Sequence, residues 1–160
     1  MSERPRAKRT TEVWSQQLAD YHRDPLAAPL PDAQRGHETI LVVDDDCEVR
    51  RTVVRILHRS GFRVLEAGSG DEAVRTAGQE AGPIHLVLAD VVMPGMTTDE
   101  LRDRVAQVRP GTTILFMSGY IDDPEVRQRV LHGPVAFLAK PFTVAGLVGT
   151  IRSELASRRN

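Results

Sequence analysis

The chain has 160 residues, enough for one domain with a hydrophobic core, and its 41% hydrophobic and 27% charged residues are typical of a globular protein. Its 21 Lys and Arg against 22 Asp and Glu give a formal net charge of -1, so no overall field would attract nucleic acid or an anionic membrane. The single Cys47 excludes an internal disulfide, and the basic N-terminus lacks the apolar block of a signal peptide; we therefore expect a cytoplasmic protein.

The first 36 residues differ in composition from the rest of the chain. They combine a basic start with several prolines and contain no strand-like run, so residues 1–36 are expected to form a flexible tail. Within them Trp14, Leu18 and Tyr21 fall at i, i+4 and i+7, which would suit one short amphipathic helix. The alternative is a disordered leader, because a helix of about a dozen residues is unstable alone in water. The folded domain is expected over residues 37–160.

From Thr39 onward, short apolar runs alternate with amphipathic segments. The apolar runs predict strands at 39–43, 62–67, 84–90, 112–117 and 135–138. The segments between and after them predict five helices, which end near Gly61, span 71–81, follow a Thr97–Glu100 capping box, begin at Asp123-Pro124, and follow a Thr143 cap. This alternation predicts an α/β fold of the (βα)5 type, a doubly wound five-stranded parallel sheet with helices on both faces.

Polar residues follow four of the five strands. Asp44 and Asp45 come after the first strand, Asp90 ends the third, Ser118 follows the fourth and Lys140 the fifth. In such sheets ligands bind outside the carboxyl ends of the strands, so these groups are expected at one rim. Singly, each has a simpler structural interpretation: acids cap helices, Ser before Gly forms turns, and Lys is commonly a solvated charge. Their shared position at one rim favours a functional site.

The chemistry of this site follows from its charges. Three carboxylates within a few ångströms of one another repel by about 4 kcal/mol per pair at an effective dielectric near 20, unless a cation compensates. Ligands that are all oxygen favour a hard divalent ion such as Mg²⁺. A nucleophilic Asp90 beside Mg²⁺, Lys140 and the Ser118 hydroxyl has the parts expected for phosphoryl transfer to an aspartate.

Four motifs, LVVDDD, LVLADVVMPGM, ILFMSGY and AFLAKPF, together resemble the receiver domain of two-component response regulators over about residues 38–156. The resemblance implies a flavodoxin-like sheet with strand order 2-1-3-4-5. It makes Asp90 the phosphoacceptor. It makes Asp45, Asp90 and the Val92 carbonyl direct Mg²⁺ ligands, with Asp44 holding the metal through water.

The resemblance assigns the remaining residues as well. Ser118 would be the switch hydroxyl, Lys140 the phosphate-binding lysine and Phe137 the switch aromatic, and Lys140-Pro141 would be a cis peptide. The sequences of the motifs MPGM, MSGY and AFLAKPF are most similar to those of receivers of hybrid sensor histidine kinases. The chain departs from that subgroup at Thr97-Thr98, where a Ser-Gly pair is usual, and carries an apolar Val92 and a bulky Tyr120 at positions that tune phosphoryl lifetime in the family.

The implied function is a signalling switch that is not itself classed as an enzyme. A histidine kinase or phosphotransfer protein would phosphorylate Asp90. The output would be a protein contact through the helix that begins at Asp123-Pro124, the strand 135–138 and the final helix, without direct nucleic-acid or membrane binding. Only Ala156–Asn160 follow Leu155, too few residues for an output domain, so the chain would act by protein contact, serve as a phosphorelay station, or be a piece of a larger kinase.

Two rival functions remain. One is a receiver fold that no longer cycles phosphate and acts as a docking scaffold, although every key acid and Lys140 are present. The other is a phosphatase of the haloacid dehalogenase type, because Val42–Asp46 matches its first motif. That enzyme should present its hydroxyl and lysine before its second acidic motif, whereas here Asp90 precedes both. A nucleotide-binding module is disfavoured because the chain lacks GxxxxGK[ST].

Overall fold

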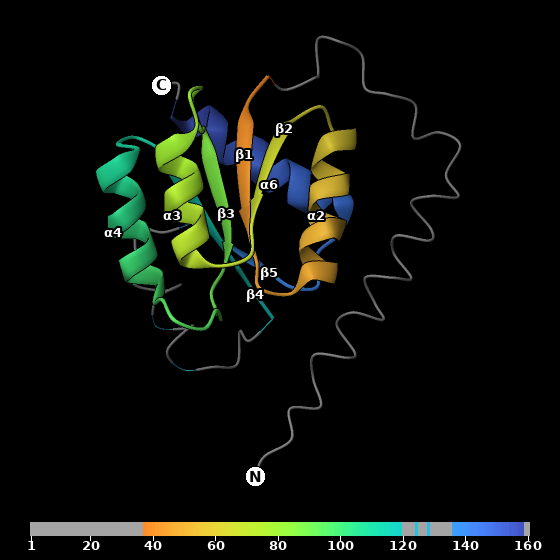
Figure 1. Cartoon of the computed structure of the whole chain (residues 1–160). Helices are drawn as coiled ribbons and strands as arrows, with labels where there is room; N and C mark the ends of the chain where they lie inside the picture. The colour runs from red at the N-terminus through yellow and green to blue at the C-terminus, as the bar shows by residue number, and fades with distance from the viewer. Residues whose placement is uncertain (1–36, 120–123, 125–127, 129–135, 159–160) are drawn as a thin grey trace.

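Five parallel strands form one sheet in the order β2-β1-β3-β4-β5 in the computed structural model, which describes residues 37–119, 124, 128 and 136–158 (Figure 1). The strands are β1 (Thr39–Val43), β2 (Arg63–Ala67), β3 (Leu86–Asp90), β4 (Thr113–Ser118) and β5 (Ala136–Ala139). The predicted doubly wound α/β fold and its strand order are therefore confirmed. The strand order reverses between β1 and β3, which are neighbours in space although β2 separates them in the chain.

Helices cover both faces of this sheet. α2 (Cys47–Arg59) and α6 (Val144–Ser157) pack on one face, while α3 (Gly70–Gln79) and α4 (Thr98–Val108) pack on the other, where Figure 1 shows α3 and α4 side by side. Successive strand residues point to opposite faces, so Ile40 and Val42 join the core beneath α2 and α6, and Leu41 and Val43 join the core beneath α3 and α4. Because both faces are covered, the strand ends are where a ligand can reach the sheet.

Short polar residues begin the helices. Asp46 caps α2 by accepting from Glu48 and Val49 amides, and Thr97 with Glu100 forms the predicted capping box of α4. Thr143 caps α6 as predicted, and Ser69 caps α3, a role that the sequence pattern did not single out. The Asp46 cap leaves Asp44 and Asp45 in the loop between β1 and α2.

Several predicted boundaries are wrong by one or two residues. The third strand begins at Leu86 rather than Ile84, although Ile84 is buried, and the second begins at Arg63. The helix predicted over 71–81 ends at Gln79, because Glu80 is extended and its carboxylate binds the Gly82 amide and Arg63, which turns the chain. The fourth strand extends to Ser118 and the fifth to Ala139, so Ser118 is the last residue of β4 and Lys140 follows β5 directly.

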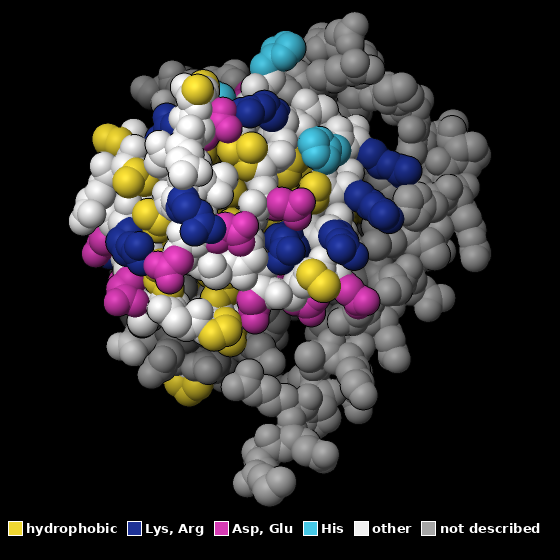
Figure 2. Space-filling view, viewed as in Figure 1, with side chains coloured by type: hydrophobic (Ala, Val, Ile, Leu, Met, Phe, Trp, Pro, Cys, Tyr) yellow, Lys and Arg dark blue, Asp and Glu magenta, His cyan; other side chains and the backbone are white. Residues whose placement is uncertain are grey.

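The outer surface of α3 and α4 is polar. Arg104 of α4 pairs with Asp71 of α3 at 2.7 Å, and Arg109 Nε donates to the Ala77 carbonyl at 2.6 Å, so polar contacts join the two helices. Figure 2 shows acidic and basic side chains interspersed over this face, with no large apolar area. This layer therefore has the character of a solvated surface.

Some predictions concern residues outside the described ranges. These are the tail over residues 1–36, Val135 at the start of the fifth strand, Tyr120, and nearly all of the helix predicted to begin at Asp123-Pro124. In the part of the chain that the structure describes, no helix combines the length and the apolar character needed to cross a bilayer.

Candidate functional site

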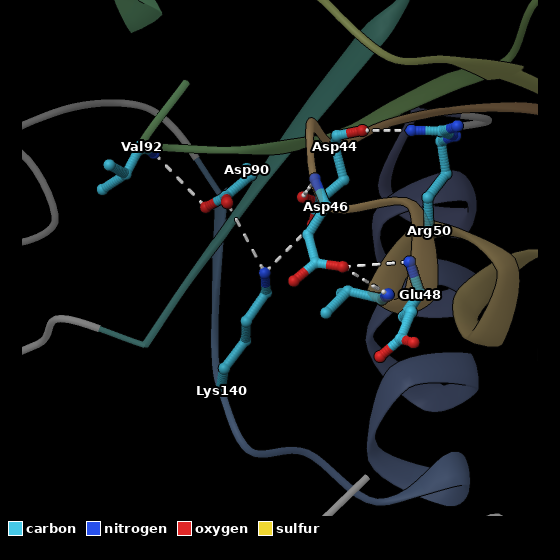
Figure 3. A network of polar contacts seen from close by, with 8 residues as sticks. Asp44, Asp46, Glu48, Arg50, Asp90, Val92 and Lys140 are labelled. Atoms are coloured by element: carbon cyan, nitrogen blue, oxygen red, sulfur yellow. Dashed lines mark hydrogen bonds and ion pairs between the residues drawn. The ribbon is translucent and has the colours of Figure 1, made fainter. Parts of the chain in front are cut away.

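The acids, Ser118 and Lys140 come together at the carboxyl edge of the sheet. Asp90 pairs with Met117 at the end of β3, and Ser118 pairs with Ala139, the residue before Lys140, so the ends of β3, β4 and β5 are aligned. Asp44 follows β1 directly. Figure 3 shows the side chains of Asp44, just after β1, and Asp90, at the end of β3, both pointing toward Lys140.

Lys140 lies between two carboxylates. Its Nζ is 3.1 Å from Asp44 Oδ2 and 3.7 Å from Asp90 Oδ2, and its side chain is only 7% exposed. The Lys140 amide also donates to the Ser118 carbonyl at 2.8 Å, and the Lys140-Pro141 peptide bond is cis. An ammonium buried beside acids is a fixed positive charge at the rim, suited to an incoming anion.

Asp44 is the most deeply buried acid of the cluster. Its Oδ1 accepts the Asp46 amide at 2.9 Å while Oδ2 receives Lys140, so both oxygens have a partner. Burial raises the pKa of Asp44 above its ordinary value, and the Lys140 charge and the two hydrogen bonds oppose that shift. This carboxylate is therefore held in place from two sides.

Asp90 reaches the surface of the rim. Its side chain is 15% exposed, and Oδ1 accepts the Val92 amide at 3.3 Å. Burial, with the negative charge of Asp44 as a smaller contribution, raises the pKa of Asp90 to about 6, although Lys140 acts in the opposite direction. Asp90 thus combines partial exposure with a carboxylate whose charge is poorly compensated.

The three acids present a set of oxygen atoms that fits a divalent cation. One carboxylate oxygen from each of Asp44, Asp45 and Asp90 lies within 4.8 Å of the others. One ammonium, Lys140, cannot neutralise three carboxylates, and oxygen-only donors suit Mg²⁺ better than a softer metal. Asp45 is exposed, and its carboxylate has no hydrogen-bond partner among the described residues, which leaves it available to a cation. Val92 lies beside the cluster through its amide contact to Asp90.

Ser118 and Phe137 occupy neighbouring strands. Ser118 is fully buried at the end of β4. Phe137 pairs with Phe116 across β4 and β5 and is half-buried against the core beneath α3 and α4. The two residues proposed as switch elements therefore lie on adjacent strands that both lead to the rim.

Arg50 is a residue of this site that the sequence interpretation missed. Its Nη1 donates to the Asp44 carbonyl at 2.7 Å (Figure 3). Its Nε donates to Glu66 Oε2 at 3.2 Å. The available signal was spacing, because Arg50 lies four residues after the Asp46 cap and its amide donates to the Asp46 carbonyl. A residue one turn into a helix can reach back to the loop before it.

The raised pKa of Asp90 predicts a pH-dependent metal affinity. A carboxyl must lose its proton to bind a cation, so Mg²⁺ should bind well at pH 7 and weaken as the pH falls through about 6. We expect Mg²⁺ binding at pH 5 to be about tenfold weaker than at pH 7, measured by following amide NMR shifts during titration. An affinity that stays constant down to pH 5 would contradict the raised pKa.

The raised pKa of Asp90 also determines how the unfolding free energy of the metal-free protein changes with pH. The folded-state pKa of Asp90 lies above the ordinary 3.8, so the folded protein binds the proton more tightly than the unfolded chain does. The stabilisation from the protonated carboxyl is complete below pH 4 and is lost as the pH rises through about 6. Denaturation of the metal-free protein by urea at these pH values would measure this loss.

The sequence matches a known family. The family profile described as "Response regulator receiver domain" matches residues 40–152. The response regulator receiver protein CpdR of Brucella abortus is 31% identical over 116 residues, which cover 72% of this chain and 95% of that protein. The sensor kinase CckA of the same organism is 35% identical over 120 residues, 75% of this chain but only 13% of the kinase.

Solved structures give the same result. The receiver domain of the hybrid histidine kinase CckA matches with a TM-score of 0.62 and 32% identity, over 73% of this chain and 98% of that one. Chemotaxis protein CheY4 of Vibrio cholerae matches with a TM-score of 0.64 and 29% identity, over 74% and 99%. The chain spans only 13%, 26% and 32% of three of its longer relatives.

The fold, the order of the motifs and these similarities agree with one another. The resemblance to receivers of hybrid histidine kinases is supported by both the CckA sequence and the CckA receiver structure. The chain therefore belongs to the family of response regulator receiver domains of two-component signalling.

Proposed function

We propose that the protein is a phosphorylation-operated switch that accepts a phosphoryl group on Asp90 from a histidine kinase or phosphotransfer protein. The observation that carries this proposal is the position of Asp90, partly exposed at the rim, with the buried Lys140 3.7 Å away and two further acids beside it. An exposed nucleophile next to a fixed cation and a divalent-metal site is what phosphoryl transfer requires.

Each residue has a part in this transfer. An Asp90 oxygen attacks the phosphorus as the bond from phosphorus to the donor's imidazole nitrogen breaks, and that nitrogen keeps the bonding electrons. Asp45, Asp90 and the Val92 carbonyl would hold Mg²⁺ directly, and Asp44 would hold it through water. The metal supplies charge neutralisation for the phosphoryl oxygens. Lys140, already oriented by Asp44, would pair with one of those oxygens.

The signal would leave through β5 and its neighbours. The new dianionic charge would draw the Ser118 hydroxyl toward the phosphoryl group, and Phe137 on the adjacent strand would rotate inward. This change would repack the surface formed by β5, α6 and the segment that begins at Asp123-Pro124. The downstream partner would be a protein that binds this surface, without direct contact to nucleic acid or a membrane, in the cytoplasm.

Replacing Ser118 should separate phosphorylation from the switch. Ser118→Ala leaves the acids and Lys140 in place, so the gain of a phosphoryl group should persist, while the hydroxyl that links it to the switch is lost. We expect intact mass to show phosphorylation, and the NMR shifts of the Phe137 ring to stay close to those of the unphosphorylated protein. Full phosphorylation-induced shifts at Phe137 in this variant would contradict the assigned role.

The direct test uses a small phosphodonor. The full chain is incubated with acetyl phosphate with and without Mg²⁺, and its intact mass is measured. A gain of one phosphoryl group only when Mg²⁺ is present is the expected result. Mg²⁺-independent labelling would contradict the metal role.

A docking scaffold with the receiver fold is the alternative function. It predicts no phosphoryl gain from acetyl phosphate or from any kinase, although the protein is folded. The intact cluster of Asp44, Asp45, Asp90 and Lys140 favours the phosphorylated switch, because a scaffold has no need of these charges. The similarity to CpdR and to part of CckA fits both a separate receiver and a piece of a longer kinase.

A further inference from the structure

We propose that Arg50 is a positioning residue of the Mg²⁺ site, which acts by fixing the peptide plane that carries Asp45. This inference rests on the proposed function, because it presumes that Asp44, Asp45 and Asp90 hold the metal. Arg50 itself contacts neither the metal nor the phosphoryl group in this proposal. Its guanidinium donates instead to the backbone carbonyl of Asp44 at 2.7 Å.

Asp45 depends on its backbone for its position. Its side chain is exposed and has no hydrogen-bond partner among the described residues, whereas Asp44 is held by Lys140 and by the Asp46 amide. Without side-chain partners, the backbone sets only the direction of the Asp45 Cα–Cβ bond, and with it the region that the carboxylate can reach as it rotates. The two peptide planes that flank Asp45 therefore set whether its carboxylate can reach the oxygens of Asp44 and Asp90.

Both flanking planes are fixed by hydrogen bonds. The plane between residues 44 and 45 carries the Asp44 carbonyl, which accepts Arg50 Nη1. The plane between residues 45 and 46 carries the Asp46 amide, which donates to Asp44 Oδ1 at 2.9 Å. The Asp44 amide is tied in turn to the Ala67 carbonyl of β2 at 3.2 Å. Arg50 is thus the side-chain donor for one of the two planes.

Arg50 is itself held firmly enough for this task. Its Nε donates to Glu66 Oε2 at 3.2 Å, its side chain is 19% exposed, and its backbone belongs to α2 one turn after the Asp46 cap. Figure 3 shows Arg50 to the right of Asp44, on the side away from Lys140. A forked guanidinium that binds β2 with one nitrogen and the metal-binding loop with another joins the two elements rigidly.

Whether removal of Arg50 weakens or strengthens Mg²⁺ binding distinguishes a positioning role from an effect of its charge. Arg50 is a cation near an acidic cluster, so if only its charge mattered, its removal would strengthen Mg²⁺ binding. If it positions Asp45, its removal weakens Mg²⁺ binding. For Arg50→Ala we expect about tenfold weaker binding, at the low end of what loss of a group supporting a metal ligand usually causes.

The experiment titrates Mg²⁺ into metal-free full-length protein and follows amide NMR shifts. The matched control is Arg51→Ala, which removes the same charge from the next, exposed position of α2 and should leave the affinity unchanged or slightly higher. Arg50→Lys keeps the charge and the aliphatic stem but lacks the guanidinium that donates to both Glu66 and the Asp44 carbonyl. It should also bind Mg²⁺ more weakly than wild type. This third variant maintains the test if Arg50→Ala does not fold.

The outcomes separate this inference from the proposed function. Weaker Mg²⁺ binding in both Arg50 variants, with Arg51→Ala unaffected, supports the positioning role. Binding as tight as wild type or tighter in the Arg50 variants overturns it, while the metal site stands. If the wild-type protein itself binds no Mg²⁺, the proposed function fails with it.

Discussion

Asp90→Asn should abolish phosphorylation by acetyl phosphate, because an amide oxygen is too weak a nucleophile to form the acyl phosphate. The expected intact mass after incubation with Mg²⁺ is that of the unmodified chain, against one added phosphoryl group for wild type. Asp90 is the acid for which this is decisive, since it is 15% exposed at the rim, whereas Asp44 is buried behind Lys140. Undiminished labelling of the variant would remove Asp90 from its assigned role.

The matched control for this experiment is Asp46→Asn. It removes one carboxylate from the same loop, yet Asn caps helices about as well as Asp, so α2 should be unaffected and labelling retained.

Folding of Asp90→Asn can be verified at the same time. Because burial raises the pKa of Asp90 to about 6, its charge at pH 7 costs stability, and the amide should raise the metal-free unfolding free energy by about 2 to 3 kcal/mol. Urea denaturation measures this increase.

Lys140→Ala should slow phosphorylation by about 100-fold while leaving Mg²⁺ binding intact or tighter. The slower reaction follows from loss of the cation that would pair with a phosphoryl oxygen, since removal of one such preorganised donor commonly costs a factor of 10² to 10³. The retained metal affinity follows from charge, because Lys140 Nζ lies 3.1 Å from Asp44 and partly neutralises the cluster. The rate of mass gain and an NMR titration with Mg²⁺ measure the two effects separately.

Arg55→Ala provides the control for Lys140→Ala. It removes one positive charge from an exposed position on α2, far less buried than Lys140 with its 7% exposure, and should change neither quantity. Parallel losses of metal binding and phosphorylation in Lys140→Ala would indicate that the lysine supports the structure of the site and does not act on the phosphoryl group. Metal-free Lys140→Ala should also be less stable, because the buried Asp44 carboxylate would lose the cation that partly neutralises it.

The fold was predictable because its signals are local and repeated. Each strand is a short apolar run and each described helix starts at a small polar cap, so their number and alternation could be identified from sequence alone. One boundary error arose where a tertiary contact turns the chain. At that boundary Glu80 ends α3 by binding Arg63, which lies 17 residues earlier. The sequence of α3 by itself does not indicate that Glu80 will bind Arg63.

The residues of the site were predictable for a related reason. The carboxyl ends of parallel strands share one edge, so a polar residue after each strand must approach the others, as Asp44, Asp90, Ser118 and Lys140 do. The contact between Lys140 and Asp44 joins residues 96 positions apart, and it still follows from this rule. Arg50 could not be predicted in the same way, because it acts from within a helix and through a backbone carbonyl.

The sequence by itself determined the (βα)5 alternation, the rim and the identity of its charged groups, because these depend on periodicity and on the position of polar residues at strand ends. Only the tertiary structure decided how exposed each acid is, which oxygen faces Lys140, and that Arg50 holds the loop of Asp44 and Asp45. The physical reason is that burial and hydrogen bonding depend on distances between elements, which the order of residues along one strand or helix does not specify. The raised pKa of Asp90, which comes mainly from burial, is therefore a property of the packed structure.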